Sequence, residues 1–280
     1  MYNYDDDSNQ IKIDLNDKNI PLEYIDISII NNNKISYQTK SDNDLIKVFK
    51  KKNIINILYG MPILNGKTNY EKINEILNSE IFDKENNRSI NGEFLLISLN
   101  LKELKIKIVN DRFSSYPLYY YSNGRNFFCS TNYFNLIKLI KNNNINITLN
   151  NSAFAEFLWF RKVHGEITFH NDIYFLSSAS EFEYYKNSIR INKYWLPNFK
   201  KNNNSFKKNV EILNDKFTRA LKLKSQDFDK NRIGLFLSGG MDTRLILSSF
   251  LRMGINPVCF TVGYNKFGEY KTAKSLTNNY

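Results

Sequence analysis

The stretch GLFLSGGMDTRLIL, residues 234–247, combines a short apolar run, a Ser-Gly-Gly turn, an acid beside a hydroxyl and a second apolar run. Ile233–Leu237 is continuously apolar and ends at a glycine pair that permits turns closed to most side chains, which predicts a buried strand followed by a loop. From Asp242 the apolar residues recur at helical spacing, with Asp242 or Thr243 as a cap or first-turn residue. The predicted unit is strand, glycine loop, helix.

Such a loop has the chemistry of an anion site. It presents backbone N–H groups at the positive end of a helix dipole, and glycine leaves room for an anion to approach closely. The alternative is a plain strand-to-helix turn in which serine and aspartate only cap the helix. The occurrence of five suitable residues together favours a phosphate site, namely Ser238, Gly239, Gly240, Asp242 and Thr243. The lysine-bearing GxxxxGK[ST] loop occurs nowhere in the chain.

The segment SGGMDT resembles the SGGxDS pyrophosphate loop (PP-loop) of the N-type ATP pyrophosphatases. Its flanks are most similar to the glutamine-dependent asparagine synthetase family, which also includes beta-lactam synthetase. The resemblance implies cleavage of ATP to AMP and pyrophosphate, with activation of a carboxylate as an acyl-adenylate that a nitrogen nucleophile attacks. The expected cofactors are ATP and Mg²⁺, and the expected partners are a small-molecule carboxylate and ammonia or an amine.

The resemblance assigns roles to individual residues of this chain. It implies that Ser238, Gly239 and Gly240 cradle the phosphates that leave as pyrophosphate, and that Thr243 donates its hydroxyl where serine is more usual. Asp242 would hold Mg²⁺. The resemblance also places three residues at the adenine pocket: Leu237, Val262 and Gly263. For Val262 an ordinary strand-core position is an equal alternative, and Arg244 is either a further phosphate contact or a solvated helix residue.

The part of the chain before residue 198 is dominated by strand patterns. Hairpins are predicted in EYIDISIINNNKISYQ, in GEFLLISLNLKELKIKIVN and around Asn123-Gly124, where a type I′ turn is expected. Helical patterns occupy Tyr70–Leu77 and Ala153–Phe160. These features favour antiparallel sheets with helices packed on them. After an asparagine- and lysine-rich segment the pattern becomes an amphipathic helix along Val210–Leu221, then strands alternating with helices, as in a parallel sheet.

The earlier part also resembles the same family. NGEFLLISLN, NDRFSSYPLYYY, FFCST and the stretch from His164 to Trp195 are similar to motifs of its class II glutamine amidotransferase domain, with Ser177–Ala179 replacing the usual Pro-Gly turn. The expected fold class is therefore α+β and then α/β. An Ntn-hydrolase-like, four-layer αββα domain over residues 1–198 is followed over residues 206–280 by the start of a doubly wound parallel-sheet PP-loop domain.

Glutamine hydrolysis is expected to be absent from this amidotransferase-like domain. Active relatives carry a cysteine directly after the initiator methionine, whose amino group becomes the base for its own thiol, and Tyr2 stands at that place here. The two cysteines, Cys129 and Cys259, lie within apolar strand patterns. They and the two histidines, His164 and His170, are interpreted as structural or surface residues.

Composition narrows the remaining alternatives. The chain has 280 residues and a formal net charge of +11, and its lysines are scattered, which favours a solvated basic surface over a nucleic-acid partner. An acidic, polar start and the lack of a long apolar run predict a cytoplasmic protein without membrane insertion.

Two strands cannot complete a doubly wound sheet, so the sequence is expected to be part of a longer synthetase, or to act as a homodimer or with a partner chain that supplies the rest. Two other functions stay open. One is a non-catalytic scaffold or truncated remnant, and the other is an RNA-modifying enzyme of the same loop superfamily.

Overall fold

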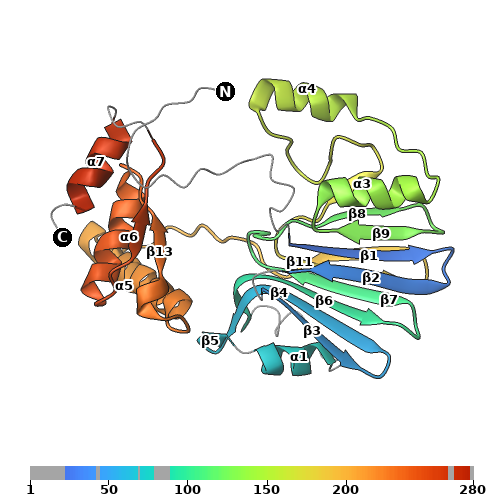
Figure 1. Ribbon diagram of the computed structural model, residues 1–280, viewed down its shortest axis with the longest axis horizontal. Coiled ribbons are helices and arrows are strands. Elements are labelled where there is room, and N and C mark those ends of the chain that lie inside the picture. Colours follow the sequence, from blue (N-terminus) through green and yellow to red (C-terminus); the bar gives the residue numbers. More distant parts are fainter. Residues whose placement is uncertain (1–22, 42–44, 69, 79–88, 264–267, 278–280) are drawn as a thin grey trace, which may run out of the picture. The chain divides into compact units, whose positions relative to one another are not determined.

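The structure is a computed structural model (Figure 1). Strands dominate the chain up to β12, and helices alternate with short strands after it. The described residues are 23–41, 45–68, 70–78, 89–263 and 268–277. They form two compact units, one drawn from residues 1–60 and 94–192 and the other from residues 61–93 and 193–280. Tyr2, where a nucleophile would stand in active relatives, lies outside the described residues.

The order of the elements follows the predicted change from strands to alternating helices and strands. They are β1 (Tyr24–Ile30), β2 (Lys34–Lys40), β3 (Ile46–Lys51), β4 (Ile54–Leu64), β5 (Lys67–Thr68), α1 (Tyr70–Asn78), β6 (Asn91–Asn100), β7 (Lys105–Asn110), β8 (Tyr119–Ser122), β9 (Phe127–Ser130), α3 (Tyr133–Asn142), α4 (Asn151–Phe160), β10 (Ile173–Phe175), β11 (Ser180–Tyr185), β12 (Ser188–Lys193), α5 (Phe206–Ser225), a 3₁₀ turn (Lys230–Arg232), β13 (Gly234–Phe236), α6 (Met241–Arg252), β14 (Val258–Phe260) and α7 (Gly268–Thr277).

Two sheets organise the earlier part of the chain. The first has the strand order β10-β8-β9-β1-β2, and each of its pairings is antiparallel. The second has the order β12-β11-β7-β6-β4-β3, with β5 paired to β4, and its pairings of known register are also antiparallel. The expectation of antiparallel sheets with helices is therefore confirmed, whereas the four-layer arrangement stays a prediction.

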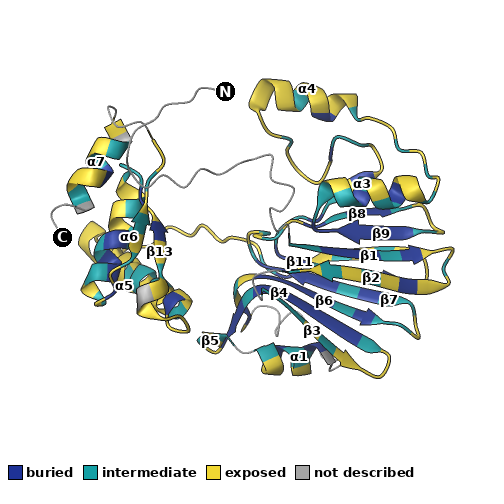
Figure 2. Cartoon of the chain, viewed as in Figure 1, coloured by how far each residue is buried: buried dark blue, intermediate teal, exposed yellow. Residues whose placement is uncertain are grey.

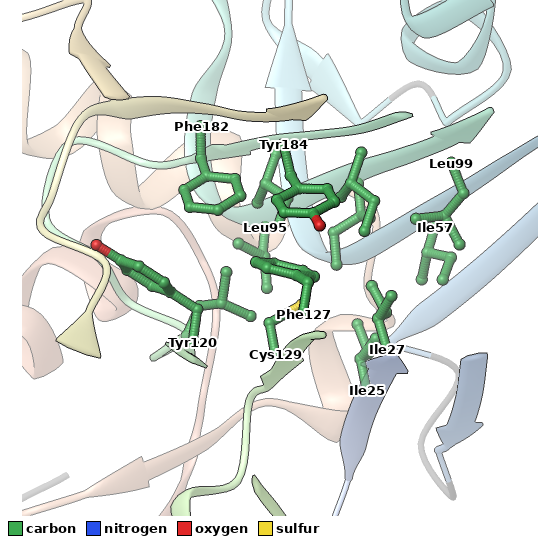
Figure 3. Packing of buried hydrophobic residues seen from close by; sticks show 14 of the residues in the cluster. Ile25, Ile27, Ile57, Leu95, Leu99, Tyr120, Phe127, Cys129, Phe182 and Tyr184 are labelled. Atoms are coloured by element: carbon green, nitrogen blue, oxygen red, sulfur yellow. The ribbon is translucent and has the colours of Figure 1, made fainter. Parts of the chain in front are cut away.

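The main core of the first unit lies between these two sheets. Alternate residues of each strand point inward, as the two-residue period of a strand requires. On β1 these are Ile25, Ile27 and Ile29, which are at most 1% exposed, and Phe127 of β9 stacks on Tyr184 of β11 with ring centroids 4.5 Å apart (Figure 3). This aromatic and aliphatic contact joins the sheets face to face.

The opposite face of the first sheet is covered by α3. Leu136 and Ile140 of this helix are fully buried against Phe128 of β9. At the start of the helix the buried carboxylate of Asp26 accepts hydrogen bonds from the Ser130 hydroxyl, at 2.6 Å, and from the Asn135 amide, at 3.3 Å. Burial raises the pKa of Asp26 above its ordinary value of 3.8, and the two hydrogen bonds oppose that rise.

A pair of buried polar residues ends β7. The carboxylate of Asp111, 1% exposed, accepts from the backbone N–H groups of Phe94, Phe113 and Ser115 at 2.8–3.2 Å and from the Ser115 hydroxyl at 3.2 Å. Its neighbour Asn110, 0% exposed, accepts from the N–H of Ser180 at 2.8 Å and donates to the Ser177 carbonyl at 2.9 Å. This pair therefore fixes two loops to the end of one strand.

The predicted hairpins are confirmed, but one turn differs from its prediction. Gly124 has a positive φ of 80° and Asn123 does not, so the turn between β8 and β9 is not type I′. The Asn123 side chain instead accepts from the N–H groups of Arg125 and Asn126, which makes a four-residue loop. Positive φ at two successive residues occurs in the β1–β2 turn, at Asn31 and Asn32.

In the second unit β13 and β14 pair in parallel, as predicted. The prediction of a buried strand over Ile233–Leu237 is wrong in part, because Phe236 is 76% exposed and only Leu235 and Leu237 are buried. These two leucines pack against Leu247 of α6 and Ala273 of α7, so one face of the strand pair is covered, whereas Phe236 is exposed. Figure 2 colours each described residue of these elements by how far it is buried.

The amphipathic helix α5 begins with a Ser205 cap, whose hydroxyl accepts from the Lys208 N–H, and extends beyond its predicted bounds. Its apolar stripe is only partly buried, since Leu213 is 68% exposed. At the other end of α5 the Lys224 ammonium pairs with Glu93, and the Gln226 amide donates to the Gly66 carbonyl at 2.9 Å.

Replacing Asp111 with alanine tests the polar pair. Three backbone N–H groups and a hydroxyl lose their acceptor, so we expect the free energy of unfolding of the first unit to fall by about 3 kcal/mol. Urea unfolding followed by tyrosine fluorescence measures this. Asp172→Ala, at an exposed aspartate, is the control and should change the value by less than about 0.5 kcal/mol. Equal effects of the two substitutions would contradict the assigned role.

The raised pKa of Asp26 makes a prediction about pH. Because the folded protein holds this proton more tightly than the unfolded chain, the contribution of Asp26 to stability is greatest at low pH and falls as pH rises from about 3.8 to the higher folded-state pKa. Asp26→Asn should remove this fall, and Ser130→Ala, which deletes a bond to the carboxylate, should steepen it. Urea unfolding of the three proteins between pH 3 and pH 7 gives the slopes. A slope unchanged in Asp26→Asn would contradict the prediction.

Candidate functional site: the glycine loop between β13 and α6

The glycine loop lies at the carboxyl end of β13, where ligands bind in open parallel sheets. Two hydrogen bonds hold the strand at that point. The Leu237 N–H donates to the Phe260 carbonyl at 2.8 Å, and the Thr261 hydroxyl donates to the Leu237 carbonyl at 2.8 Å. Thr261 was not among the expected site residues. Its position could have been recognised in the sequence, because it is a hydroxyl residue directly after the second parallel strand.

Within the loop, the Thr243 hydroxyl makes the central contacts. Its oxygen lies 3.2 Å from the Ser238 N–H, from which it accepts, and 3.0 Å from the Ser238 carbonyl and 3.1 Å from the Ser238 hydroxyl. The Ser238 hydroxyl in turn accepts from the Gly240 N–H at 3.2 Å. The structure therefore brings Ser238, Gly240 and Thr243 together, with side-chain oxygens occupying two of the loop's N–H donors.

The backbone of Gly240 is not left-handed, and space around it is tight. Gly240 is the N-cap of α6 and has φ −73° and ψ 162°, which are accessible to any residue, so the expectation of a turn closed to most side chains is wrong there. A Cβ at this position would lie 3.2 Å from the Ser238 hydroxyl oxygen. The Gly240 carbonyl also accepts from the Arg244 guanidinium at 3.2 Å, which braces the first turn of the helix.

The other expected site residues lie outside the hydrogen-bonded group of Ser238, Gly240 and Thr243. Asp242 is exposed in the first turn of α6, consistent with the first-turn alternative, since Gly240 and not Asp242 or Thr243 is the N-cap. Leu237 is 1% exposed in the small core beneath the loop. Val262, just after β14, is 89% exposed, so the alternative of a strand-core position is wrong. Gly263 follows it and is also exposed. The adenine role of these three residues stays a prediction.

A cavity of about 470 Å³ lies beside the first turn of α6. It is lined by Met241, Arg244, Leu245, Leu247, Ser248, Leu251 and Leu276. Its lining is mostly aliphatic, with the Arg244 guanidinium and the Ser248 hydroxyl as the polar groups. The cavity therefore adjoins the loop but is built from α6 and α7, not from the residues that the resemblance places at the adenine pocket.

The cysteines are buried or partly buried, and the histidines make local hydrogen bonds. Cys129 is fully buried and Cys259 is partly buried, and burial raises the pKa of both thiols. His164 bonds to the Glu156 carboxylate at 2.8 Å, and His170 bonds to the Tyr133 hydroxyl at 2.7 Å. Among the described residues no group of three or more His, Cys, Asp or Glu side chains has the arrangement of a metal site. Within the same residues no helix is long and apolar enough to cross a membrane.

Comparison with known proteins relates the earlier part of the chain to a family. Residues 64–195 match the family model of a glutamine amidotransferase domain. This range includes β6 to β12 and supports the amidotransferase domain that the sequence motifs indicate. The match ends before the glycine loop at Ser238. No protein with a curated description matches the chain in sequence.

Two of the solved structures that match the chain illustrate the likeness. One is glutamine phosphoribosylpyrophosphate amidotransferase from B. subtilis complexed with ADP and GMP, with 9% identity and a TM-score of 0.32, covering 62% of this chain and 44% of that one. The other is described as the allosteric regulatory enzyme of purine biosynthesis, with 9% identity and a TM-score of 0.34, covering 91% of this chain and 63% of that one. The chain spans less than two thirds of the length of either.

The Thr243 hydroxyl offers a direct test of the loop geometry. Thr243→Val keeps the side-chain shape and deletes the hydroxyl, which leaves the Ser238 N–H without its acceptor at a cost of about 1–2 kcal/mol. We expect amide hydrogen exchange in residues 234–247 to become about tenfold faster. Thr243→Ser keeps the hydroxyl and should retain slow exchange. The geometry would be contradicted if valine and serine at this position gave the same exchange rate.

Proposed function

We propose that the protein takes part in ATP-dependent amide formation, in which a carboxylate is activated as an acyl-adenylate with release of pyrophosphate. The observation that carries the proposal is the SGGMDT loop at the carboxyl end of β13, followed directly by α6. The resemblance to the asparagine synthetase family and the match to a glutamine amidotransferase domain point to the same class of chemistry, the transfer of nitrogen to carbon.

The loop has the groups that a pyrophosphate needs. The N–H groups of Ser238 and Gly240 donate to the hydroxyls of Thr243 and Ser238, and phosphate oxygens can replace these hydroxyls as acceptors. The displaced hydroxyls then donate to the same phosphates, because a hydroxyl is both donor and acceptor. In this proposal the loop exchanges its internal hydrogen bonds for bonds to the ligand without a change of backbone.

The expected Mg²⁺ is compatible with the donors present. Asp242 supplies one exposed carboxylate beside the loop, and Mg²⁺ in phosphate sites commonly uses one or two protein carboxylates, with phosphate oxygens and water completing its shell. When bound, the ion would offset the negative charge of the phosphate oxygens. The role of Asp242 is to hold that ion beside Ser238 and Thr243.

The nitrogen donor in this proposal is ammonia or an amine. In active relatives the nucleophile that attacks glutamine is a cysteine thiol, and burial raises the pKa of both Cys129 and Cys259, which disfavours their reactive thiolate forms. Cys129 in addition has no exposed surface. The amidotransferase-like domain then acts as a scaffold for the ligase reaction.

Binding of Mg²⁺-pyrophosphate and Mg²⁺-ATP, measured by isothermal titration calorimetry, tests the loop. We expect Asp242→Asn to weaken both affinities by about tenfold or more. Asp215→Asn, at an exposed aspartate of α5, is the matched control and should leave them unchanged. ATP–pyrophosphate exchange with a panel of carboxylates, beginning with L-aspartate, then tests adenylation. Binding that Asp242→Asn does not alter would overturn the proposal and favour a non-catalytic scaffold.

A further inference from the structure

A second cavity, of about 570 Å³, lies in the first unit and is separate from the glycine loop. It is lined by Tyr119, Tyr133, Phe134, Lys162, Val163, Gly165, Ile167, Thr168, Phe169 and Phe175. Its volume falls within the range of about 300–1,000 Å³ that is typical of small-molecule sites. Neither the expected site residues nor the proposed ATP chemistry uses this cavity.

Aromatic rings form most of its wall. Tyr119 of β8 meets Tyr133 of α3 edge to face, with ring centroids 5.0 Å apart, and lies 5.6 Å from the ring of Phe175 on β10. Phe169 packs on Phe154 of α4 with centroids 4.8 Å apart. Rings held in this way by neighbouring rings offer a rigid apolar surface, which suits a flat aromatic ligand.

A polar cluster fixes the ring of Tyr133. Its hydroxyl lies 2.7 Å from Nδ1 of His170 and 3.3 Å from the hydroxyl of Thr168. Thr168, 7% exposed, donates to the Ile173 carbonyl at 2.8 Å. The cluster ties α3, β10 and the loop between α4 and β10 together, so the cavity is formed before any ligand enters.

Two donors of the lining remain available. The Tyr119 hydroxyl has no hydrogen-bond partner within the described part of the chain, and burial raises the pKa of that phenol, so it stays protonated and can donate. The ammonium of Lys162 forms no ion pair with any described residue. The carboxylates near it in sequence already have partners, since Glu156 pairs with His164 and Glu166 accepts from the Ser177 hydroxyl.

We propose that this cavity binds an aromatic monocarboxylic acid, with its ring against Tyr119 and Phe175 and its carboxylate at Lys162 and the Tyr119 hydroxyl. A lining of rings with a single cation disfavours nucleotides and other polyanions, which need several donors. A cationic ligand is disfavoured because Lys162 would repel it and no free carboxylate among the described residues lines the cavity.

The probe for this site is 2-naphthoate, compared with the neutral 2-naphthamide and the cationic 2-naphthylmethylammonium. Isothermal titration calorimetry of the full chain should show saturable binding of one naphthoate, with the amide weaker by about fivefold or more and the cation weaker still. The absence of saturable naphthoate binding, or equal affinity for the three probes, would overturn the proposal.

Variants of the lining test whether the probe binds in this cavity or on another apolar surface. Lys162→Met removes the charge and keeps the apolar stem, and should weaken naphthoate by about fivefold with no effect on the amide. Lys138→Met, at an exposed lysine of α3 outside the cavity, is the matched control and should leave binding unchanged. Val163→Trp or Ile167→Trp fills the cavity and should abolish binding of all three probes, with circular dichroism confirming the fold. Retained binding in both filled and folded variants would assign the probe to another surface and overturn the proposal.

Discussion

The end of β7 is the point on which the first unit depends. Asn110 and Asp111 are both buried, and a buried carboxylate is tolerated only where hydrogen bonds replace the water that it has lost. Asp111 receives four such bonds from its own loop and from β6, while Asn110 bonds to the loop that precedes β11. The hydrogen bonds of these two residues therefore join three adjacent strands of the second sheet, namely β6, β7 and β11.

The elements of the first unit could be predicted from the sequence because their signals are local. Alternating apolar residues predict the β1–β2, β6–β7 and β8–β9 hairpins, and these are present with antiparallel register. The turn between β8 and β9 could not be predicted in detail, because Asn-Gly is compatible with several turns. The Asn123 side chain determines the observed turn, because it accepts hydrogen bonds from two backbone N–H groups of its own loop.

Burial in the second unit shows what apolar runs leave undetermined. A continuous apolar run is typical of a strand covered on both faces, but it contains no information about what covers each face. Leu235 and Leu237 of the run are packed under α6 and α7, whereas Phe236 and its partner Phe260 lie on the other face, 5.9 Å apart and exposed to 76% and 44%. The same limit applies to Val262, whose exposure depends on tertiary neighbours and not on its strand-like surroundings.

The glycine loop and the aromatic cavity differ in how far the sequence alone can predict them. The glycine loop is read from six consecutive residues, because backbone N–H groups at a helix start are contributed by one short segment. The aromatic cavity is assembled from β8, α3, β10 and the loop after α4, which are separated by up to 56 positions between Tyr119 and Phe175. Its rings and Lys162 are unremarkable in sequence, and only their convergence in the fold gives them chemical meaning. A site of that kind follows from packing, so its ligand must be argued from the charge and shape of the lining.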